Sequence, residues 1–127
     1  MSYYFNKTIQ GGFDQVIDQV TEALKTQGFG VLTEIDFSGT LKKKLDVDVP
    51  NYRILGACNP QFAYETYKQE NKIGVMLPCN VIVQQVENGI EVSAVDPIAM
   101  MAGVGNSALE STAGEVQARL KAVIDSL

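Results

Sequence analysis

Apolar and polar residues alternate over two stretches in the second half of the chain, residues 81–86 and 90–95. Alternation with a period of two is typical of strands that bury one face. Asn88-Gly89 lies between the two stretches, and this dipeptide favours a tight type I′ hairpin turn. The predicted register pairs Glu87 with Ile90, Gln85 with Val92, Val83 with Ala94 and Val81 with Asp96. The face expected to meet the core carries Val81, Val83, Ile90, Val92 and Ala94.

The opposite face of this hairpin is half apolar. Gln84, Glu91 and Ser93 share it with Ile82, Val86 and Val95. A contiguous apolar surface of this kind is unusual on a monomer. We therefore expect a loop or another subunit to cover it, and we predict a homodimer joined through a surface or edge of the sheet.

Three other regions show sequence features typical of helices. A stripe of apolar residues with a spacing of three and four runs from Phe13 to Leu24, and Gly28 follows it where a helix commonly ends with a left-handed residue. Asn59-Pro60 supplies an N-cap and a first-turn proline for a helix that reaches about Glu70, with Phe62, Ala63 and Tyr67 expected on its buried face. A last stripe comprises Leu109, Ala113, Val116, Leu120, Ile124 and Leu127.

The remaining elements complete a single α+β domain over residues 1–127. Strands are predicted at Tyr3–Ile9, Gly30–Phe37 and Tyr52–Cys58. A Ser38-Gly39-Thr40 turn leads into a short Leu41–Leu45 helix. Ser107 to Glu110 match a capping box before the last helix and Thr112 to Glu115 match a second one, so this helix can start at either place. The order β-α-β-(α)-β-α-β-β-α predicts a mixed, mainly antiparallel sheet of about five strands with helices on one face.

Charge and hydropathy exclude several classes of partner. The net charge is −5 over 127 residues. Nucleic acids and anionic membranes require a basic surface, so neither is expected as a partner. The apolar runs are shorter than the roughly 20 residues of a spanning helix. The chain starts at Met1-Ser2-Tyr3 without a secretion signal, so we expect a cytoplasmic protein with free thiols.

The chain contains no histidine. This removes the Ser-His-Asp and Cys-His forms of catalysis, the usual general base near neutral pH and the commonest metal ligand. No cofactor is indicated by any motif. The composition therefore favours a module without catalytic activity.

Two cysteines form the main chemical hypothesis. Cys58 ends one predicted strand and Cys79 begins the next, so antiparallel pairing of these strands brings the two sulfur atoms close together. Asp96 is expected at the same end of the sheet, and a helix N-terminus at Asn59 stabilises a neighbouring thiolate. Such a site suits thiol redox chemistry, sulfur transfer or a soft metal. The alternative is that both cysteines are small buried hydrophobes.

Three weaker hypotheses concern ligand sites. Lys42, Lys43 and Lys44 can receive an anion or simply form a solvated helix face. The loop 103–107 can present backbone N–H groups to an anion or act as an ordinary capped loop. Aromatic residues either line a small-molecule pocket or pack in the core: Tyr52, Phe62, Tyr64 and Tyr67.

Four motifs resemble those of one known family. They are Leu41-Lys42-Lys43-Lys44-Leu45, the run from Tyr52 to Pro60, Leu77-Pro78-Cys79-Asn80-Val81, and Asp96-Pro97 with Met100. In this order the motifs resemble the domain of unknown function 302 family. The resemblance covers nearly the whole chain and implies the α+β fold called TT-seventeen-fifty-one-like. It implies no activity, so it only marks positions for inspection: Lys44, Cys58, Asn59, Pro60, Pro78, Cys79 and Asp96.

Together these patterns predict a homodimeric α+β module that binds a small molecule or an ion, with a small molecule or an anion as its possible partner. The candidate ligand-binding residues are Lys44, Cys58, Asn59, Cys79 and Asp96. The alternative function is thiol redox, sulfur handling or soft-metal binding through Cys58 and Cys79.

Overall fold

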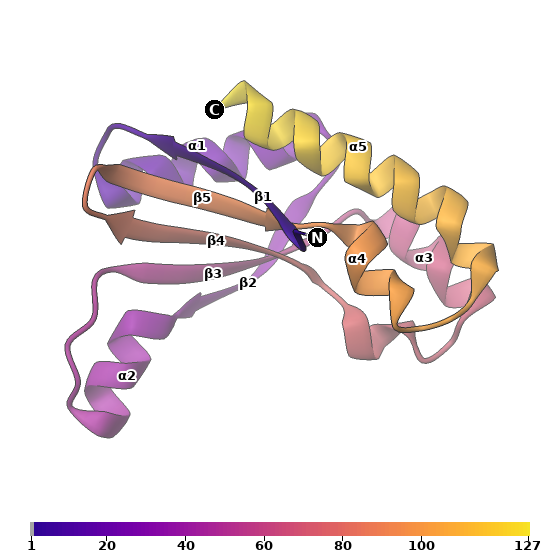
Figure 1. Ribbon diagram of the computed structural model, residues 1–127, viewed down its shortest axis with the longest axis horizontal. Coiled ribbons are helices and arrows are strands. Elements are labelled where there is room, and N and C mark those ends of the chain that lie inside the picture. Colours follow the sequence, from indigo (N-terminus) through magenta and orange to yellow (C-terminus); the bar gives the residue numbers. More distant parts are fainter. Residues whose placement is uncertain (1) are drawn as a thin grey trace.

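Five antiparallel strands form one sheet in the order β1-β5-β4-β3-β2 (Figure 1). The computed structural model describes residues 2–127. The strands are β1 Tyr4–Ile9, β2 Gly30–Asp36, β3 Tyr52–Cys58, β4 Cys79–Val86 and β5 Gly89–Val95. The helices are α1 Phe13–Thr26, α2 Phe37–Leu45, α3 Pro60–Gln69, α4 Pro97–Ala102 and α5 Glu110–Ser126, with 3-10 turns η1 Ile73–Met76 and η2 Ser107–Leu109. The predicted α+β fold with about five strands is confirmed.

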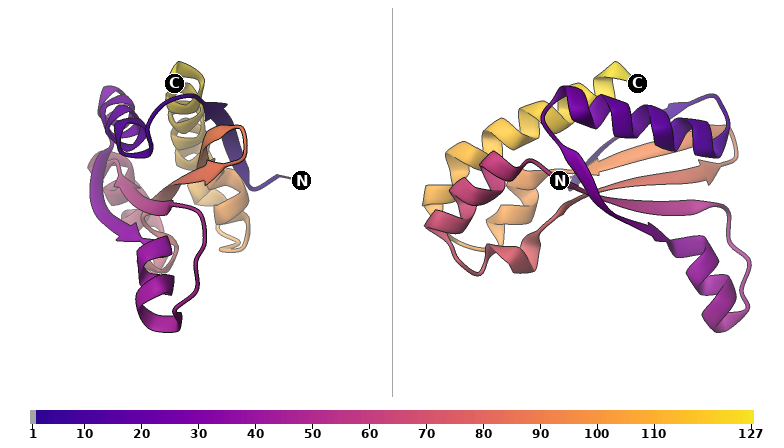
Figure 2. Two further views of the ribbon diagram at one scale, coloured as in Figure 1. Left: turned by 90° about the vertical axis from the view of Figure 1, so that its left-hand side faces the viewer. Right: turned by 180° about the vertical axis from the view of Figure 1, so that it is seen from behind.

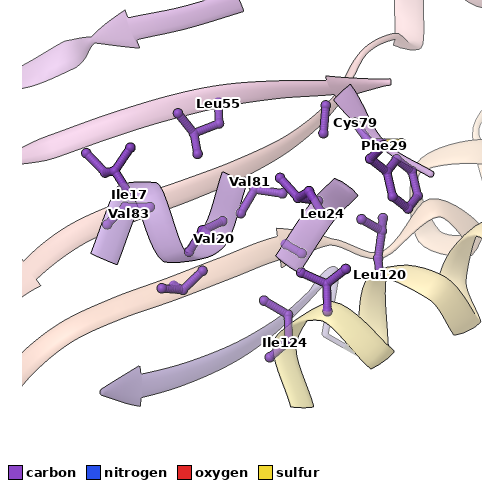
Figure 3. Packing of buried hydrophobic residues seen from close by; sticks show 14 of the residues in the cluster. Ile17, Val20, Leu24, Phe29, Leu55, Cys79, Val81, Val83, Leu120 and Ile124 are labelled. Carbon is purple, nitrogen blue, oxygen red and sulfur yellow. The ribbon is translucent and has the colours of Figure 1, made fainter. Parts of the chain in front are cut away.

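The core lies between the sheet and the two long helices, α1 and α5. Both helices pack on the same face of the sheet, and the last helix lies beside α1 (Figures 1 and 2). Leu24 from α1 and Leu120 from α5 are both fully buried, and they meet Val81 of β4 in the cluster drawn in Figure 3. The predicted core face of the β4–β5 hairpin is confirmed, since all five of its residues are buried.

The predicted hairpin register is wrong by two residues. Val83 pairs with Val92 and Val81 with Ala94, and the two turn residues are Glu87 and Asn88 instead of Asn88 and Gly89. Gly89 pairs with Val86 and has a φ of 152°. A Cβ atom on Gly89 would lie 2.7 Å from the Ile9 carbonyl oxygen of β1. The glycine is therefore required by the close approach of β1, and it does not form a type I′ turn.

Two helix starts also differ from the prediction. Helix α2 begins at Phe37, four residues before the predicted start at Leu41. The Asp36 side chain accepts a hydrogen bond from the Gly39 backbone N–H and caps the helix there. Ser107 does not form a capping box. Instead, the Asn106 side chain accepts from the Ala108 N–H and starts a 3-10 turn, after which α5 begins at Glu110.

Two helix ends match the prediction. Gly28 is left-handed with a φ of 83°, and the Phe29 N–H donates to the Leu24 carbonyl over 3.0 Å. This closes α1 as the sequence indicated. Asn59 caps α3, with Pro60 as its first residue. These two ends lie next to each other, since the Asn59 side chain donates to the Gln27 carbonyl over 3.4 Å.

Candidate functional site

Strands β3 and β4 are antiparallel neighbours, as the thiol hypothesis required. Ala57 pairs with Cys79, so the end of β3 lies beside the start of β4. Cys58 is the last residue of β3 and Cys79 the first of β4. Both thiols therefore lie at one end of the sheet, and both cysteines are free.

A small cavity of about 40 Å³ opens at this end of the sheet. Both cysteines line it, together with residues of α3, α4 and α5 that close over the strand ends. Its lining comprises Phe29, Ala57, Cys58, Asn59, Phe62, Ala63, Thr66, Leu77, Pro78, Cys79, Pro97, Met101, Thr112, Ala113 and Val116. Most of these side chains are apolar, and the Thr66 hydroxyl donates to the Ala63 carbonyl within its own helix over 2.9 Å. The cavity therefore favours an apolar occupant.

The structure brings together three of the five candidate ligand-binding residues. Cys58, Asn59 and Cys79 line the cavity, whereas Lys44 and Asp96 do not. Lys44 lies on α2, away from the cavity. The Asp96 carboxylate caps α4, accepting from the Ile98 N–H over 3.0 Å and from the Gln117 side chain over 3.1 Å.

The aromatic residues separate into different regions. Phe62 lines the cavity, whereas Tyr64 and Tyr67 are 60% and 56% exposed on α3. The expectation that Tyr67 is buried is therefore wrong, and Thr66 takes that place in the helix. Tyr52 lies on the sheet face opposite the cavity helices, where it faces Gln84.

Burial raises the pKa of both thiols. The pKa of Cys58 lies above its usual 9.0 because the thiol is partly desolvated. The pKa of Cys79 is raised to about 11, mainly by burial and further by the neighbouring Cys58. Both groups are therefore protonated at neutral pH, opposite to the thiolate expected from the N-terminus of α3. A protonated, buried thiol behaves as a small apolar group.

A larger groove adjoins the cavity. Its volume is about 530 Å³, and it runs between α4 and the start of α5. Met101 and Ala113 line both spaces, so they form a common wall. The lining of the groove also includes the polar residues Asn106, Ser107 and Glu110.

Sequence analysis missed several residues of this site. Ala63 and Ala113 are small lining residues, and an alanine within a helical stripe carries no signal that separates cavity lining from core packing. Met101 was not among the candidate site residues. Their common position follows from how α3, α4 and α5 converge, which depends on tertiary packing.

Among residues 2–127, no group of three or more Cys, Asp or Glu side chains is placed to hold a metal ion. Nor does any helix in this part of the chain have the length and apolarity needed to span a membrane.

Comparison with known proteins agrees with this fold. The family model described as "Domain of unknown function DUF302" matches residues 5–127. The chain belongs to the DUF302 family. The resemblance inferred from the four motifs is therefore confirmed.

A crystal structure of an uncharacterized conserved DUF302 protein from Bacillus stearothermophilus is similar to this chain, with a TM-score of 0.92 and 27% sequence identity over 98% of each chain. No curated protein matches. Membership of the DUF302 family fixes the fold and leaves the activity to be argued from the site.

Proposed function

We propose that the protein binds a small amphipathic molecule without catalysing a reaction. The apolar tip of the molecule occupies the cavity between Cys58 and Cys79, and the rest lies in the groove between α4 and α5. The observation that carries this proposal is the shared wall of Met101 and Ala113, which places an apolar cavity next to a larger, partly polar groove.

The volumes set the size of this molecule. A cavity needs about 10–15 Å³ to hold one water molecule, so a cavity of about 40 Å³ accepts a tip of about three non-hydrogen atoms. The groove has room for a longer portion. Of its polar residues Asn106 and Ser107, Ser107 offers its hydroxyl to the polar end of the molecule, because the Asn106 side chain already bonds Gln69, Glu70 and Ala108. Glu110 lies beside them, so a neutral or cationic polar end is favoured over an anion.

The raised pKa values of the two thiols support binding over the alternative of thiol chemistry. Redox and sulfur-transfer reactions proceed through a thiolate. Burial raises the pKa of both Cys58 and Cys79, which disfavours that form. Free thiols of this kind suit a reducing compartment, and we propose a cytoplasmic location on that ground.

A titration with straight-chain alcohols from ethanol to 1-hexanol tests the binding proposal. Each added CH₂ buried in an apolar site contributes about 0.8 kcal/mol, so affinity should rise with chain length by a few-fold per carbon. Methyl resonances of Ala57, Ala63 and Ala113, followed by NMR, should shift on saturation. The variant Ala63→Leu, which fills the cavity, should lose this response. Unmoved lining resonances, or equal shifts in the variant, would contradict the proposal.

We also propose that the protein forms a homodimer through the sheet face opposite α1 and α5. Within the described residues no helix covers this face, which carries a row of Ile35, Ile54 and Ile82 across adjacent strands. Sedimentation equilibrium at micromolar concentration should give the mass of a dimer.

A further inference from the structure

We propose that residues 37–50, called here the arm, pack on the open sheet face of a second copy of the chain, and that the two copies exchange arms reciprocally. The open face is the sheet surface opposite α1 and α5. This inference rests on the proposed homodimer and identifies the surfaces that form it.

The arm has little support from its own chain. It consists of α2 and the segment leading to β3, and it projects from the sheet on the side away from α1 and α5 (Figures 1 and 2). None of the nine residues of α2 is buried. Its base is held by Phe37, whose ring centroid lies 5.0 Å from that of Tyr52, and by the Ser38 hydroxyl, which accepts from the Tyr52 N–H. An isolated helix of this length is marginal in water, so a packing partner is expected.

Exposed apolar residues concentrate in and next to the arm. Of the twelve large hydrophobic residues exposed within residues 2–127, half lie between positions 32 and 49. They are Leu32, Ile35, Phe37, Leu45, Val47 and Val49. Leu45 alone is 67% exposed. Scattered exposed apolar residues are ordinary, but a concentration of this kind in one segment marks an interaction site.

The open face provides a hollow that suits the arm. A depression of about 350 Å³ lies over β5 and β4, with Tyr4, Tyr52 and Ile82 among its lining residues. Aromatic side chains of this kind are typical anchors at protein interfaces. Glu91 lies in the same hollow, where its carboxylate accepts from the Asn6 side chain over 3.2 Å and from the Gln84 side chain over 3.0 Å. The receiving surface is thus mainly apolar, with the Glu91 carboxylate and the polar residues Asn80 and Ser93 in its lining.

Charge on the arm complements this surface. The arm holds three of the ten basic residues and only two of the fifteen acidic ones, so it is net positive in a chain whose remainder is strongly negative. Lys42 pairs with Asp46 over 3.0 Å within the arm itself. Leu41, Lys44 and Leu45 are spaced to share another face of α2. That face presents two leucines and one cation, which match the hollow and Glu91 of a second copy.

Reciprocal exchange explains why the partner is a second copy. Each copy has one arm and one open face, so a two-fold axis satisfies both arms and both faces in a closed dimer. The acidic body of another copy also attracts the basic arm, whereas a basic partner would repel it.

Sedimentation equilibrium on matched variants tests the arm directly. Leu45→Glu places a charge in the proposed contact and should raise the dimer dissociation constant by at least about tenfold. Val75→Glu is the control, because Val75 is 84% exposed on η1, outside the proposed interface. It should leave the dissociation constant unchanged. Circular dichroism should show that both variants keep the fold.

A charge exchange gives a second, independent check. Lys44→Glu and Glu91→Lys should each weaken the dimer, and the double variant should restore much of the lost affinity. A wild-type dimer that tolerates Leu45→Glu and shows no restoration overturns the arm inference while leaving the homodimer intact. A monomeric wild-type chain at micromolar concentration overturns both.

Discussion

Replacing Leu24 by alanine should lower the free energy of unfolding by about 2–5 kcal/mol. Leu24 is fully buried at the end of α1, where it packs against β4 and α5 (Figure 3). Removing three side-chain carbons leaves a cavity between two rigid layers that collapse only partly. Urea denaturation followed by circular dichroism measures the change.

The neighbouring Glu22→Ala variant is the matched control for this prediction. Glu22 lies on the exposed side of the same helix, where it pairs with Lys25 over 3.1 Å with both side chains largely in solvent. Its loss should change stability by less than about 0.5 kcal/mol. Equal changes in the unfolding free energy of the two variants would contradict the burial of Leu24 between α1, β4 and α5.

Stability should fall as the pH rises from about 9 to about 11, because of Cys79. Its pKa is raised to about 11 in the folded protein, mainly by burial, whereas the ordinary value is 9.0. A raised pKa means that the folded state favours the protonated thiol. The resulting stability is complete below pH 9 and is lost as the pH passes through the folded pKa. A difference of about two units corresponds to roughly 2–3 kcal/mol.

The variant Cys79→Ala isolates this effect. It removes the titrating group and keeps a small apolar side chain at the cavity wall. Its unfolding free energy, measured in urea at pH 8, 9, 10 and 11, should decline less steeply than that of the unchanged protein. Parallel declines would mean that the Cys79 thiol titrates normally and that the cavity is open to water.

The hairpin shows what the sequence determines locally. Alternation identified both strands and the correct buried face, although the register was wrong by two residues. A shift of two leaves every side chain on the same face, because side chains alternate with a period of two. The turn itself was misplaced because Gly89 is needed for the close approach of β1. A local sequence pattern does not reveal a contact between Gly89 and Ile9, which are 80 positions apart.

The candidate site was predictable only in part. Antiparallel pairing of β3 with β4 followed from chain order, and it correctly placed Cys58 beside the start of β4. The position of Asp96 depended on the mistaken register, and its carboxylate caps α4 instead of lining the cavity. The cavity itself results from how three helices meet over the strand ends. Packing angles of that kind are not encoded in the periodicity of any one segment.

Burial determines the protonation state of the two thiols. From the sequence, the N-terminus of α3 next to Cys58 favoured a thiolate. In the fold, the desolvation of both sulfur atoms outweighs that effect and raises both pKa values. The same two residues thus line an apolar cavity, which supports binding and not sulfur chemistry.

Crystals exposed to xenon under pressure test the proposed binding cavity most directly. Xenon enters preformed apolar cavities and scatters strongly enough to be located without ambiguity. We expect xenon between Cys79, Phe62 and Ala113, and its absence from crystals of Ala63→Leu. Xenon bound only elsewhere, with this cavity empty at the same pressure, would contradict the account.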